Sequence, residues 1–443
     1  MPLRVVVVGA GLAGLTTADR LVTAGAEVTV LEASMRIGGR TFTHHADFVD
    51  GRYAEAGAEW IDTVHERVHA LIHRFGLHLD PTTTTWTAVR RWLHRDGQLL
   101  GPDQLIETDP RFTDDLDRFE SYIGAVAEGI ADPARPDLHP DAARLDAMSV
   151  ADVIAELGLG ELAQLFAHRN MQGEFAAEPR EVSVLFIAQQ RAVYAAAHAE
   201  HGAVEAQRLL GGVGALSGGL AAELPDGTIH RGQVVRRVQT TSSGVRVHTV
   251  ADRYDADAVV MACSLPAMRD VVFSPALPRD LAAAVSGLGY GTVTKTALQY
   301  PVRAWPAGYA TTEGRVQRVY EPTAGLPGDT GILMAYTGGA GGRELAALTE
   351  PERMDLVEIG QRAMYPNLAH RVGGFSQAWS ADPLFGGSYA VYRPGEITRF
   401  WNVLRRPWGR IHFAGEHTAT WTGYLEGAIE SGETVAATLL TTG

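Results

Sequence analysis

The sequence predicts a mixed α/β fold, in which a Rossmann-like dinucleotide-binding domain is interleaved with a second domain of mixed sheet and inserted helices. Three observations lead to this prediction. A strand, a glycine-rich turn, a helix and a second strand follow one another near the N-terminus. Long segments with helical periodicity then occupy the region from residue 76 to residue 204. A strand and a helix return at the C-terminal end.

The N-terminal βαβ unit can be justified element by element. Residues 3–8 (LRVVVV) are apolar and β-branched without alternation, as expected of a strand buried on both faces. Residues 12–25 (LAGLTTADRLVTAG) have helical periodicity and end at Gly25. Residues 27–33 (EVTVLEA) predict a second strand.

The turn between the first strand and the helix carries the pattern GxGxxG, at Gly9, Gly11 and Gly14. In this position the first glycine permits a tight turn, the second lets the backbone approach a pyrophosphate, and the third lets the helix pack closely on the strand. The helix N-terminus offers free N–H groups to phosphates. Glu32 ends the second strand, close to the spacing at which a carboxylate accepts from ribose hydroxyls. These residues predict a dinucleotide site but do not distinguish NAD from FAD.

The rest of the chain predicts two interleaved domains. Segments 114–131 and 150–170 have helical periodicity, and Ser149 with Asp152 resembles a capping box that opens the second segment. Short strands separated by glycine-rich turns follow, and we place them at residues 230–240, 242–250 and 256–263. We assign residues 1–75, 205–290 and 385–443 to the nucleotide-binding domain, and residues 76–204 and 291–384 to the substrate-binding domain.

Charge and composition exclude several classes of protein. With 38 Lys and Arg against 52 Asp and Glu the formal charge is −14, which argues against nucleic acid because phosphates require a basic surface. Cys263 is the single cysteine, so no intrachain disulfide can form, and the histidines show no metal-ligand spacing, so we expect no metal. No apolar run is long enough to span a membrane and no leader precedes the first strand. We therefore expect a cytoplasmic protein without membrane association.

Motifs at both ends of the chain give a resemblance to a known family. Residues 36–41 (RIGGRT) follow Glu32, and residues 413–418 (FAGEHT) and 423–428 (GYLEGA) lie near the C-terminus. With these motifs the chain resembles, over its whole length, the flavin-containing monoamine oxidase family, which also includes polyamine, L-amino-acid and nicotine oxidases. The resemblance implies that the dinucleotide is FAD and that the nucleotide-binding domain is an FAD-binding domain.

The resemblance also implies which residues contact FAD. Residues 55–60 (EAGAEW) bring small side chains to a place where backbone could lie beside the flavin ring, and the last helix would direct its N-terminal dipole at the flavin. Val235 would offer its main chain to the adenine, although an ordinary strand valine is nearly as good an interpretation. Ser34 departs from the basic residue of many members. The implied contacts are Gly9, Gly11, Gly14, Glu32, Ala33, Gly39, Arg40, Gly57, Ala58, Glu59, Trp60, Val235, Gly415, Glu416 and Leu425.

Lys295 is the first candidate catalytic residue. It lies in GYGTVTKTALQY, a predicted strand on which an isolated lysine is usually an outward-facing charge. The resemblance implies instead a lysine that holds a water near flavin N5. A buried ammonium there would assist the reaction of reduced flavin with dioxygen, because negative charge develops at that place.

Three aromatic residues form the second candidate set. By resemblance, Trp379 lies near the flavin, and Tyr389 and Tyr424 face one another as an aromatic cage through which the amine reaches the ring. Aromatic faces attract an ammonium, whereas burial favours the neutral amine that hydride loss requires. Ordinary core tyrosines are the alternative interpretation. Ser388 stands where mitochondrial monoamine oxidases carry the cysteine that bonds to the flavin, so we expect noncovalent FAD.

These residues together predict an FAD-dependent amine oxidase. Hydride would pass from the carbon next to nitrogen to flavin N5, the resulting imine would hydrolyse to a carbonyl compound, and dioxygen would reoxidise the flavin with release of hydrogen peroxide. An L-amino-acid oxidase, with Arg169 or Arg191 as carboxylate clamp, and a desaturase of the same fold are alternatives, as is a non-catalytic flavin-binding protein. The expected partners are a small amine or amino acid and dioxygen. A homodimer is compatible with the sequence, which specifies neither the oligomeric state nor the particular amine.

Overall fold

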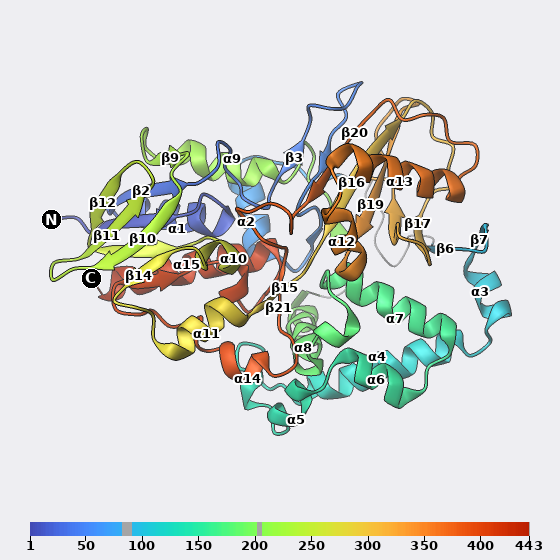
Figure 1. Ribbon diagram of the computed structural model, residues 1–443, viewed down its shortest axis with the longest axis horizontal. Helices are drawn as coiled ribbons and strands as arrows, with labels where there is room; N and C mark the ends of the chain where they lie inside the picture. The colour runs from blue at the N-terminus through green and yellow to red at the C-terminus, as the bar shows by residue number, and fades with distance from the viewer. Residues whose placement is uncertain (82–90, 202–205, 443) are drawn as a thin grey trace.

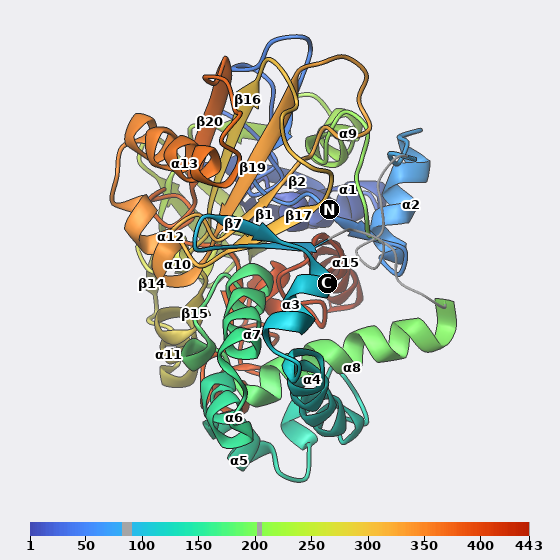
Figure 2. The same cartoon turned by 90° about the vertical axis from the view of Figure 1, so that its right-hand side faces the viewer.

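The structure is a computed structural model that describes residues 1–81, 91–201 and 206–442. One group of sheets lies at the end of the molecule that holds both chain termini, and a second, larger sheet lies at the other end (Figure 1). A group of helices lies beneath the larger sheet, as Figure 2 shows from the side. The mixed α/β fold predicted from the sequence is confirmed.

A five-stranded parallel sheet brings together segments that are far apart in the sequence. Its order is β22 (Ile411–Phe413), β13 (Ala258–Met261), β1 (Arg4–Val8), β2 (Glu27–Glu32) and β9 (Ile229–Arg231). The central strand β1 is buried on both faces, as its uninterrupted valines predict. Val5 and Val7 pack with α1 (Leu12–Thr23) and α15 (Leu425–Thr442), and Val6 and Val8 belong to the core on the other side.

A four-stranded sheet covers that other side. Its order is β12 (Arg253–Ala256), β11 (Val245–Thr249), β10 (Val235–Thr240) and β14 (Val272–Ser274). The single strand predicted at 230–240 is wrong, because β9 and β10 belong to different sheets. Gly232, which has a φ of +72°, lies in the turn between them, a conformation that glycine adopts without steric cost.

The larger sheet has seven strands, and every neighbouring pair except β17 with β6 is antiparallel. Its order is β20 (Gly373–Ala378), β16 (Thr294–Tyr300), β19 (Gly331–Thr337), β18 (Arg318–Tyr320), β17 (Tyr309–Thr312), β6 (Arg91–Arg95) and β7 (Gln98–Leu100). Helices α12 (Gly339–Ala346) and α13 (Glu350–Met364) pack against it. The predicted strand that carries Lys295 is β16, and all seven of its residues are buried.

The inserted helices are α3 (Pro102–Thr108), α4 (Phe112–Glu128), α5 (Ala142–Ala147), α6 (Val150–Leu157), α7 (Glu161–Glu174) and α8 (Val184–His201). The capping box at the start of α6 is confirmed: Ser149 and Asp152 each accept the other's backbone N–H. The continuous helix predicted over 150–170 is wrong. It is divided at Gly158, which ends α6 in the left-handed conformation, with a φ of +60°.

The remaining elements are short and connect these layers. The strands are β3 (Thr43–His44), β4 (Ala54–Glu55), β5 (Ile61–Asp62), β8 (Ala206–Gln207), β15 (Gly289–Tyr290) and β21 (Ala390–Val391). The α-helices are α2 (Glu66–Arg74), α9 (Gly214–Glu223), α10 (Leu265–Met268), α11 (Arg279–Gly287) and α14 (Glu396–Phe400). The described residues also form the 3₁₀ turns η1 (Pro136–Leu138), η2 (Pro179–Glu181) and η3 (Glu416–Thr418).

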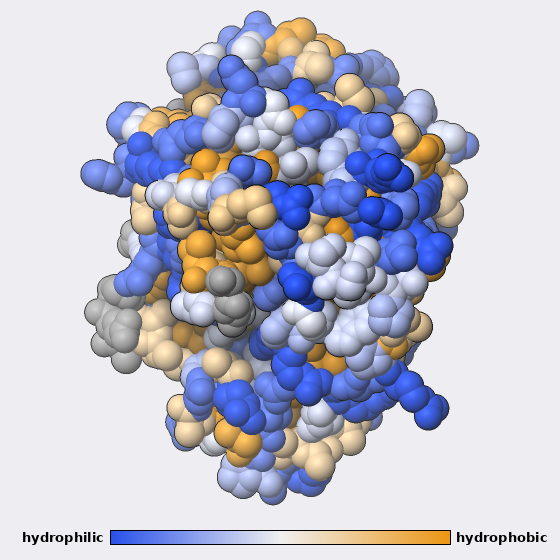
Figure 3. Space-filling model, turned by 90° about the vertical axis from the view of Figure 1, so that its left-hand side faces the viewer, coloured by the Kyte–Doolittle hydropathy of each residue, from blue (hydrophilic) through white to orange (hydrophobic). Residues whose placement is uncertain are grey.

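The predicted division into two interleaved domains stays a prediction, and its boundary at 204/205 lies outside the described residues. The strands of the parallel sheet come from 1–75, 205–290 and 385–443, and those of the seven-stranded sheet from 76–204 and 291–384. The surface near the termini is largely hydrophilic, with apolar residues in separate patches (Figure 3). Within the described part of the chain, no helix has the length and apolar character needed to cross a bilayer.

Candidate active site

One cavity of about 1000 Å³ connects the parallel sheet with the seven-stranded sheet and the helices. Its wall includes the turns that follow β1 and β2, where the carboxyl ends of parallel strands form the usual binding edge of a doubly wound sheet. All predicted site residues except Gly14 lie in this wall. They are Gly9, Gly11, Glu32, Ala33, Gly39, Arg40, Gly57, Ala58, Glu59, Trp60, Val235, Lys295, Trp379, Tyr389, Gly415, Glu416, Tyr424 and Leu425.

The three glycines of the GxGxxG motif have different surroundings. Gly9 has a φ of +110°, which a side chain would strain. A Cβ on Gly14 would lie 2.0 Å from the carbonyl oxygen of Gly9, so Gly14 serves the packing of α1 on β1 and not the cavity. A Cβ on Gly11 would meet nothing closer than the Cα of Gly39 at 4.0 Å. The space beside Gly11 therefore belongs to the cavity, and a bound group can approach the backbone there.

Glu32 is held rigidly at the end of β2. One of its carboxylate oxygens accepts the backbone N–H of Ala10 at 2.7 Å, and the other accepts that of Ser34 at 2.8 Å. The Ser34 hydroxyl donates to the carbonyl of Arg36 at 2.5 Å and does not line the cavity. Ser34, which departs from the family pattern, therefore provides no side-chain contact to the cavity, whereas Glu32 lies in its wall.

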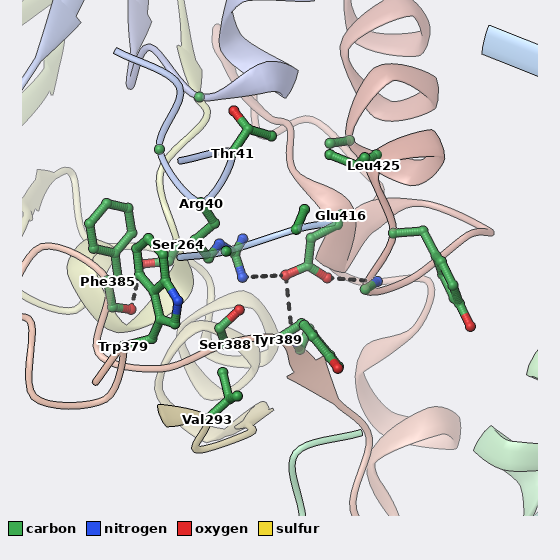
Figure 4. Close-up of a pocket in the computed structure, with 18 of the residues that line it drawn as sticks. Arg40, Thr41, Ser264, Val293, Trp379, Phe385, Ser388, Tyr389, Glu416 and Leu425 are labelled. Carbon is green, nitrogen blue, oxygen red and sulfur yellow. Dashed lines mark hydrogen bonds and ion pairs between the residues drawn. The ribbon is translucent and has the colours of Figure 1, made fainter. Parts of the chain in front are cut away.

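Arg40 and Glu416 form a largely buried ion pair in the cavity wall, with Nη1 2.9 Å from Oε1 (Figure 4). Glu416 also accepts the backbone N–H groups of Ala390 at 3.2 Å and Gly423 at 3.0 Å. Burial opposes the charge of Arg40, but Glu416 outweighs it and the pKa of Arg40 is raised. The pair joins the RIGGRT segment to the C-terminal motif, which sequence spacing alone does not show.

The segment that contains Gly57 lies against Trp379. The indole Nε1 donates to the carbonyl of Ala56 at 2.8 Å, and the ring packs edge-on against Phe385 with centroids 4.9 Å apart (Figure 4). A Cβ on Gly57 would lie 1.8 Å from the carbonyl oxygen of Arg40. Only glycine fits there, and the approach of this backbone to the flavin ring stays a prediction.

Lys295 points into the cavity wall and is only 3% exposed. Its Nζ donates to Glu59 Oε2 at 2.8 Å and to the carbonyl of Gly57 at 3.0 Å. The Tyr320 hydroxyl also donates to Glu59, and Arg208 lies 3.0 Å from its other oxygen. Burial acts to raise the pKa of Glu59, but the charges of Lys295 and Arg208 hold it below its usual value. The structure thus joins two residues that the sequence suggested for separate roles.

Tyr389 and Tyr424 both line the cavity but have different neighbours. The Tyr389 hydroxyl lies 2.7 Å from that of Tyr336 and donates to the carbonyl of Gly173 at 3.2 Å. Burial raises the pKa of Tyr389 to about 12 and raises the pKa of Tyr424 as well. Tyr424 packs in an aromatic cluster with Tyr194, Trp421 and His65. The facing arrangement of the two rings stays a prediction.

A family model described as flavin containing amine oxidoreductase matches residues 12–440 of the chain. The chain belongs to this family. This amine oxidoreductase is 27% identical to an amine oxidase [flavin-containing] of Danio rerio, over 97% of the chain and 84% of that protein. It is 26% identical to an L-amino-acid oxidase of Echis ocellatus, over 98% of the chain and 88% of that protein. A solved structure of cyclohexylamine oxidase from Brevibacterium oxydans is similar with a TM-score of 0.88 and 25% identity, over 100% of this chain and 99% of that one.

These comparisons confirm the resemblance found in the sequence motifs. They also confirm, at the level of the family, the prediction of a flavin-dependent oxidoreductase that acts on amines. Cys263 and Ser388 of this amine oxidoreductase both line the cavity, and burial raises the pKa of the Cys263 thiol to about 12, so the thiol is protonated at neutral pH.

Neither arginine considered as a carboxylate clamp is free. Arg169 donates to the backbone carbonyls of Thr312 and Glu313 and is not part of the cavity wall. Arg191 lies in the wall but pairs with Glu174 at 2.7 Å. In this amine oxidoreductase both guanidiniums are held by the protein itself.

Among the residues that sequence reasoning missed are three on inner strands of the seven-stranded sheet. Arg318 and Tyr320 of β18 and Tyr336 of β19 line the cavity. No motif marks the segment that contains them. The only local signal is that residues two apart on a strand, such as Arg318 and Tyr320, share a face.

Proposed function

We propose that this chain is an FAD-dependent oxidase of small amines, with FAD held noncovalently. The observation that carries the proposal is that one and the same cavity is lined by the GxGxxG turn, by Lys295 and by the two tyrosines. When bound, FAD would accept a hydride from the carbon next to the substrate nitrogen and would be reoxidised by dioxygen, which leaves as hydrogen peroxide. The imine product would be hydrolysed by water to a carbonyl compound.

The residues at the parallel sheet fit FAD. Gly11 leaves room for a group against the backbone, and the N-terminus of α1 provides N–H groups for phosphates. Glu32 retains lone pairs for ribose hydroxyls, since each of its oxygens accepts one backbone N–H. We propose that residues 1–75, 205–290 and 385–443 form the FAD-binding domain, with the main chain of Val235 beside the adenine.

The residues near Lys295 fit the oxidative half of the reaction. The ammonium is buried and fixed by Glu59 and the Gly57 carbonyl, so no reorganisation is needed when negative charge develops on dioxygen. A water held by the same Nζ remains compatible with these contacts, because an ammonium has three donors.

The tyrosines and Trp379 fit the binding of an amine. Their rings would shield a bound amine from water, and a dry site disfavours the ammonium form and supplies the neutral amine that can lose a hydride. The carbon to be oxidised would lie between Tyr389 and Tyr424, on the side of the cavity where Trp379 and Gly57 meet.

Noncovalent binding of FAD rests on the side chain of Ser388, which cannot form a thioether. Boiling the protein and removing the precipitate should leave all of the yellow colour in the supernatant. Colour that stays with the precipitated protein would contradict the proposal. The cytoplasmic location and the oligomeric state stay predictions.

Anaerobic titration of the purified protein with a panel of amines tests the function. We expect the flavin absorbance near 450 nm, the usual region of oxidised flavin, to bleach with at least one amine, and admission of air to restore it with one equivalent of peroxide. A flavin that stays oxidised with every amine and amino acid would favour the non-catalytic alternative.

A further inference from the structure

The cavity wall contains a guanidinium for which residues 1–81, 91–201 and 206–442 provide no acidic partner. Arg318 lies in β18 and lines the cavity; its Nη2 donates to the side-chain carbonyl of Asn170 at 3.0 Å. Its Nε is buried and has no hydrogen-bond partner. Among the residues that the structure describes, no carboxylate forms an ion pair with Arg318.

The carboxylates in this part of the wall are engaged elsewhere. Glu59 pairs with Lys295 at 2.8 Å, and Glu174 pairs with Arg191 at 2.7 Å. Asp62 accepts from the Tyr194 hydroxyl at 2.6 Å, and burial raises its pKa. No carboxylate in the described part of the chain therefore balances the positive charge of Arg318.

Arg318 lies next to the proposed slot for the amine. It is the register partner of Tyr336 across β18 and β19, and the Tyr336 hydroxyl lies 2.7 Å from that of Tyr389. Gly173, whose carbonyl accepts from Tyr389, provides the space for the guanidinium: a Cβ there would lie 1.5 Å from Nη1. The guanidinium also lies 5.6 Å from the ring centroid of Tyr309.

We propose that Arg318 binds a carboxylate of the substrate, so that the preferred substrates are amino acids or other small amines that carry a carboxylate. This inference rests on the proposed amine oxidase function. A guanidinium with unused N–H groups matches a carboxylate in charge and in planar geometry. A simple ammonium would meet the unbalanced charge of Arg318 in a buried place, whereas a carboxylate on the same molecule neutralises that charge. The nearby cation also favours the neutral form of the amino group, the form that can be oxidised.

Matched substrate pairs test the proposal on the unmodified protein. The pairs are phenylalanine with phenylethylamine, leucine with isoamylamine, and aminohexanoate with hexylamine, each followed by the rate of anaerobic flavin reduction. We expect the carboxylate member of at least one pair to have the higher kcat/KM by at least about 30-fold, the size expected for one buried charge pair. Preference for the plain amine in every pair would overturn the proposal and leave the amine oxidase function intact. No reduction by any member would instead count against the amine oxidase function.

Two variants that each remove one positive charge distinguish a direct contact of Arg318 with the substrate from an effect of net charge. Arg315→Gln is the control, because that side chain is 71% exposed in the same region of chain and lies 4.0 Å from Glu344. We expect Arg318→Gln to lose at least about 30-fold in kcat/KM with the carboxylate substrate, mainly through KM, and to show no such loss with the plain amine, from which a repulsive charge has been removed, while Arg315→Gln changes neither rate.

A binding measurement makes the test independent of turnover. Benzoate, a carboxylate without an oxidisable amine, should perturb the flavin absorbance of the wild type, bind at least about 30-fold more weakly to Arg318→Gln, and bind with intermediate strength to Arg318→Lys. Equal benzoate affinity in all three proteins would overturn the assignment. Should Arg318→Gln not fold, the Arg318→Lys variant and the substrate pairs still decide the question.

Discussion

Lys295 shows how a single residue takes its meaning from a distant partner. On β16 it could point to either face, and a lysine on an exposed face would be an ordinary solvated charge. Its burial is tolerated because Glu59 provides a counter-charge and the Gly57 carbonyl a second acceptor. Because Glu59 is also bonded by Tyr320 and lies near Arg208, the pair is part of a small buried network.

Removing either partner should therefore be costly. We expect Lys295→Met and Glu59→Gln each to lower the free energy of unfolding by roughly 3 kcal/mol, because each removes one partner of a buried ion pair and leaves the other charge in the interior. The double variant should lose clearly less than the sum of the two single changes. Urea unfolding of the four proteins measures this cycle. Strict additivity would show that the two residues do not interact.

The same variants separate stability from chemistry. Lys295→Met should slow the reaction of reduced flavin with dioxygen by about 100-fold, the usual effect of losing one fixed electrostatic group. Flavin reduction by the amine should change less. Stopped-flow measurement of the two half-reactions checks this, and an unchanged reoxidation rate would remove Lys295 from the proposed role.

The turn that joins β1 to α1 makes a prediction at the scale of an element. Gly11 and Gly14 belong to one motif but differ in what a methyl group would meet. Gly11→Ala should fold normally and bind FAD much more weakly, because the added Cβ enters the cavity. Gly14→Ala should lose stability with or without FAD, since its Cβ would lie 2.0 Å from the carbonyl oxygen of Gly9. Thermal unfolding with and without added FAD distinguishes the two, and identical behaviour would contradict this division of roles.

Elements also mark where local patterns stop being sufficient. The helical periodicity of residues 150–170 is genuine, yet Gly158 divides it, because glycine accepts the left-handed conformation that ends a helix. The β-rich run at 230–240 is divided between two sheets at Gly232. In both places the residue types were predicted correctly as helix or strand formers, and one glycine decided the connectivity.

At the scale of the whole molecule, two buried groups outside the cavity wall give stability an unusual dependence on pH. Burial lowers the pKa of His65 to about 3, and His65 Nδ1 accepts the backbone N–H of Asp62. Burial raises the pKa of Glu55 to about 7, although Val213 N–H and the Thr43 hydroxyl donate to its carboxylate. The stabilising contribution of neutral His65 is therefore complete above the pKa of about 6.5 that it has in the unfolded chain, and it is lost as the pH falls. The contribution of protonated Glu55 is complete below the unfolded pKa of about 4.5, and it is lost as the pH rises toward 7.

Between about pH 4.5 and 6.5 these two contributions change in opposite directions and nearly cancel. We expect Glu55→Gln to make the free energy of unfolding fall on acidification by roughly 1.4 kcal/mol per pH unit more than in the wild type. His65→Gln should make the free energy of unfolding rise, relative to that of the wild type, as the pH falls through this range. Urea unfolding across this range measures both slopes, and two variants with the wild-type slope would contradict the assignment.

The sequence by itself determined the parts of this protein whose physics is local. A valine run, a GxGxxG turn and a carboxylate after the second strand specify a nucleotide-binding βαβ unit, because backbone conformation and helix N-terminal geometry depend on neighbours along the chain. The family motifs at the two ends extended this to the residues proposed to bind the cofactor, and nearly all of them lie in one cavity wall.

Only the tertiary structure decided which side chains meet across the cavity. Lys295 and Glu59 are 236 residues apart, and Arg40 and Glu416 are 376 residues apart, so neither pair follows from spacing or periodicity. The unbalanced charge of Arg318 could not be recognised in the sequence either. Whether a charged side chain has a partner depends on every element packed around it, and that is settled only when distant strands and helices come together.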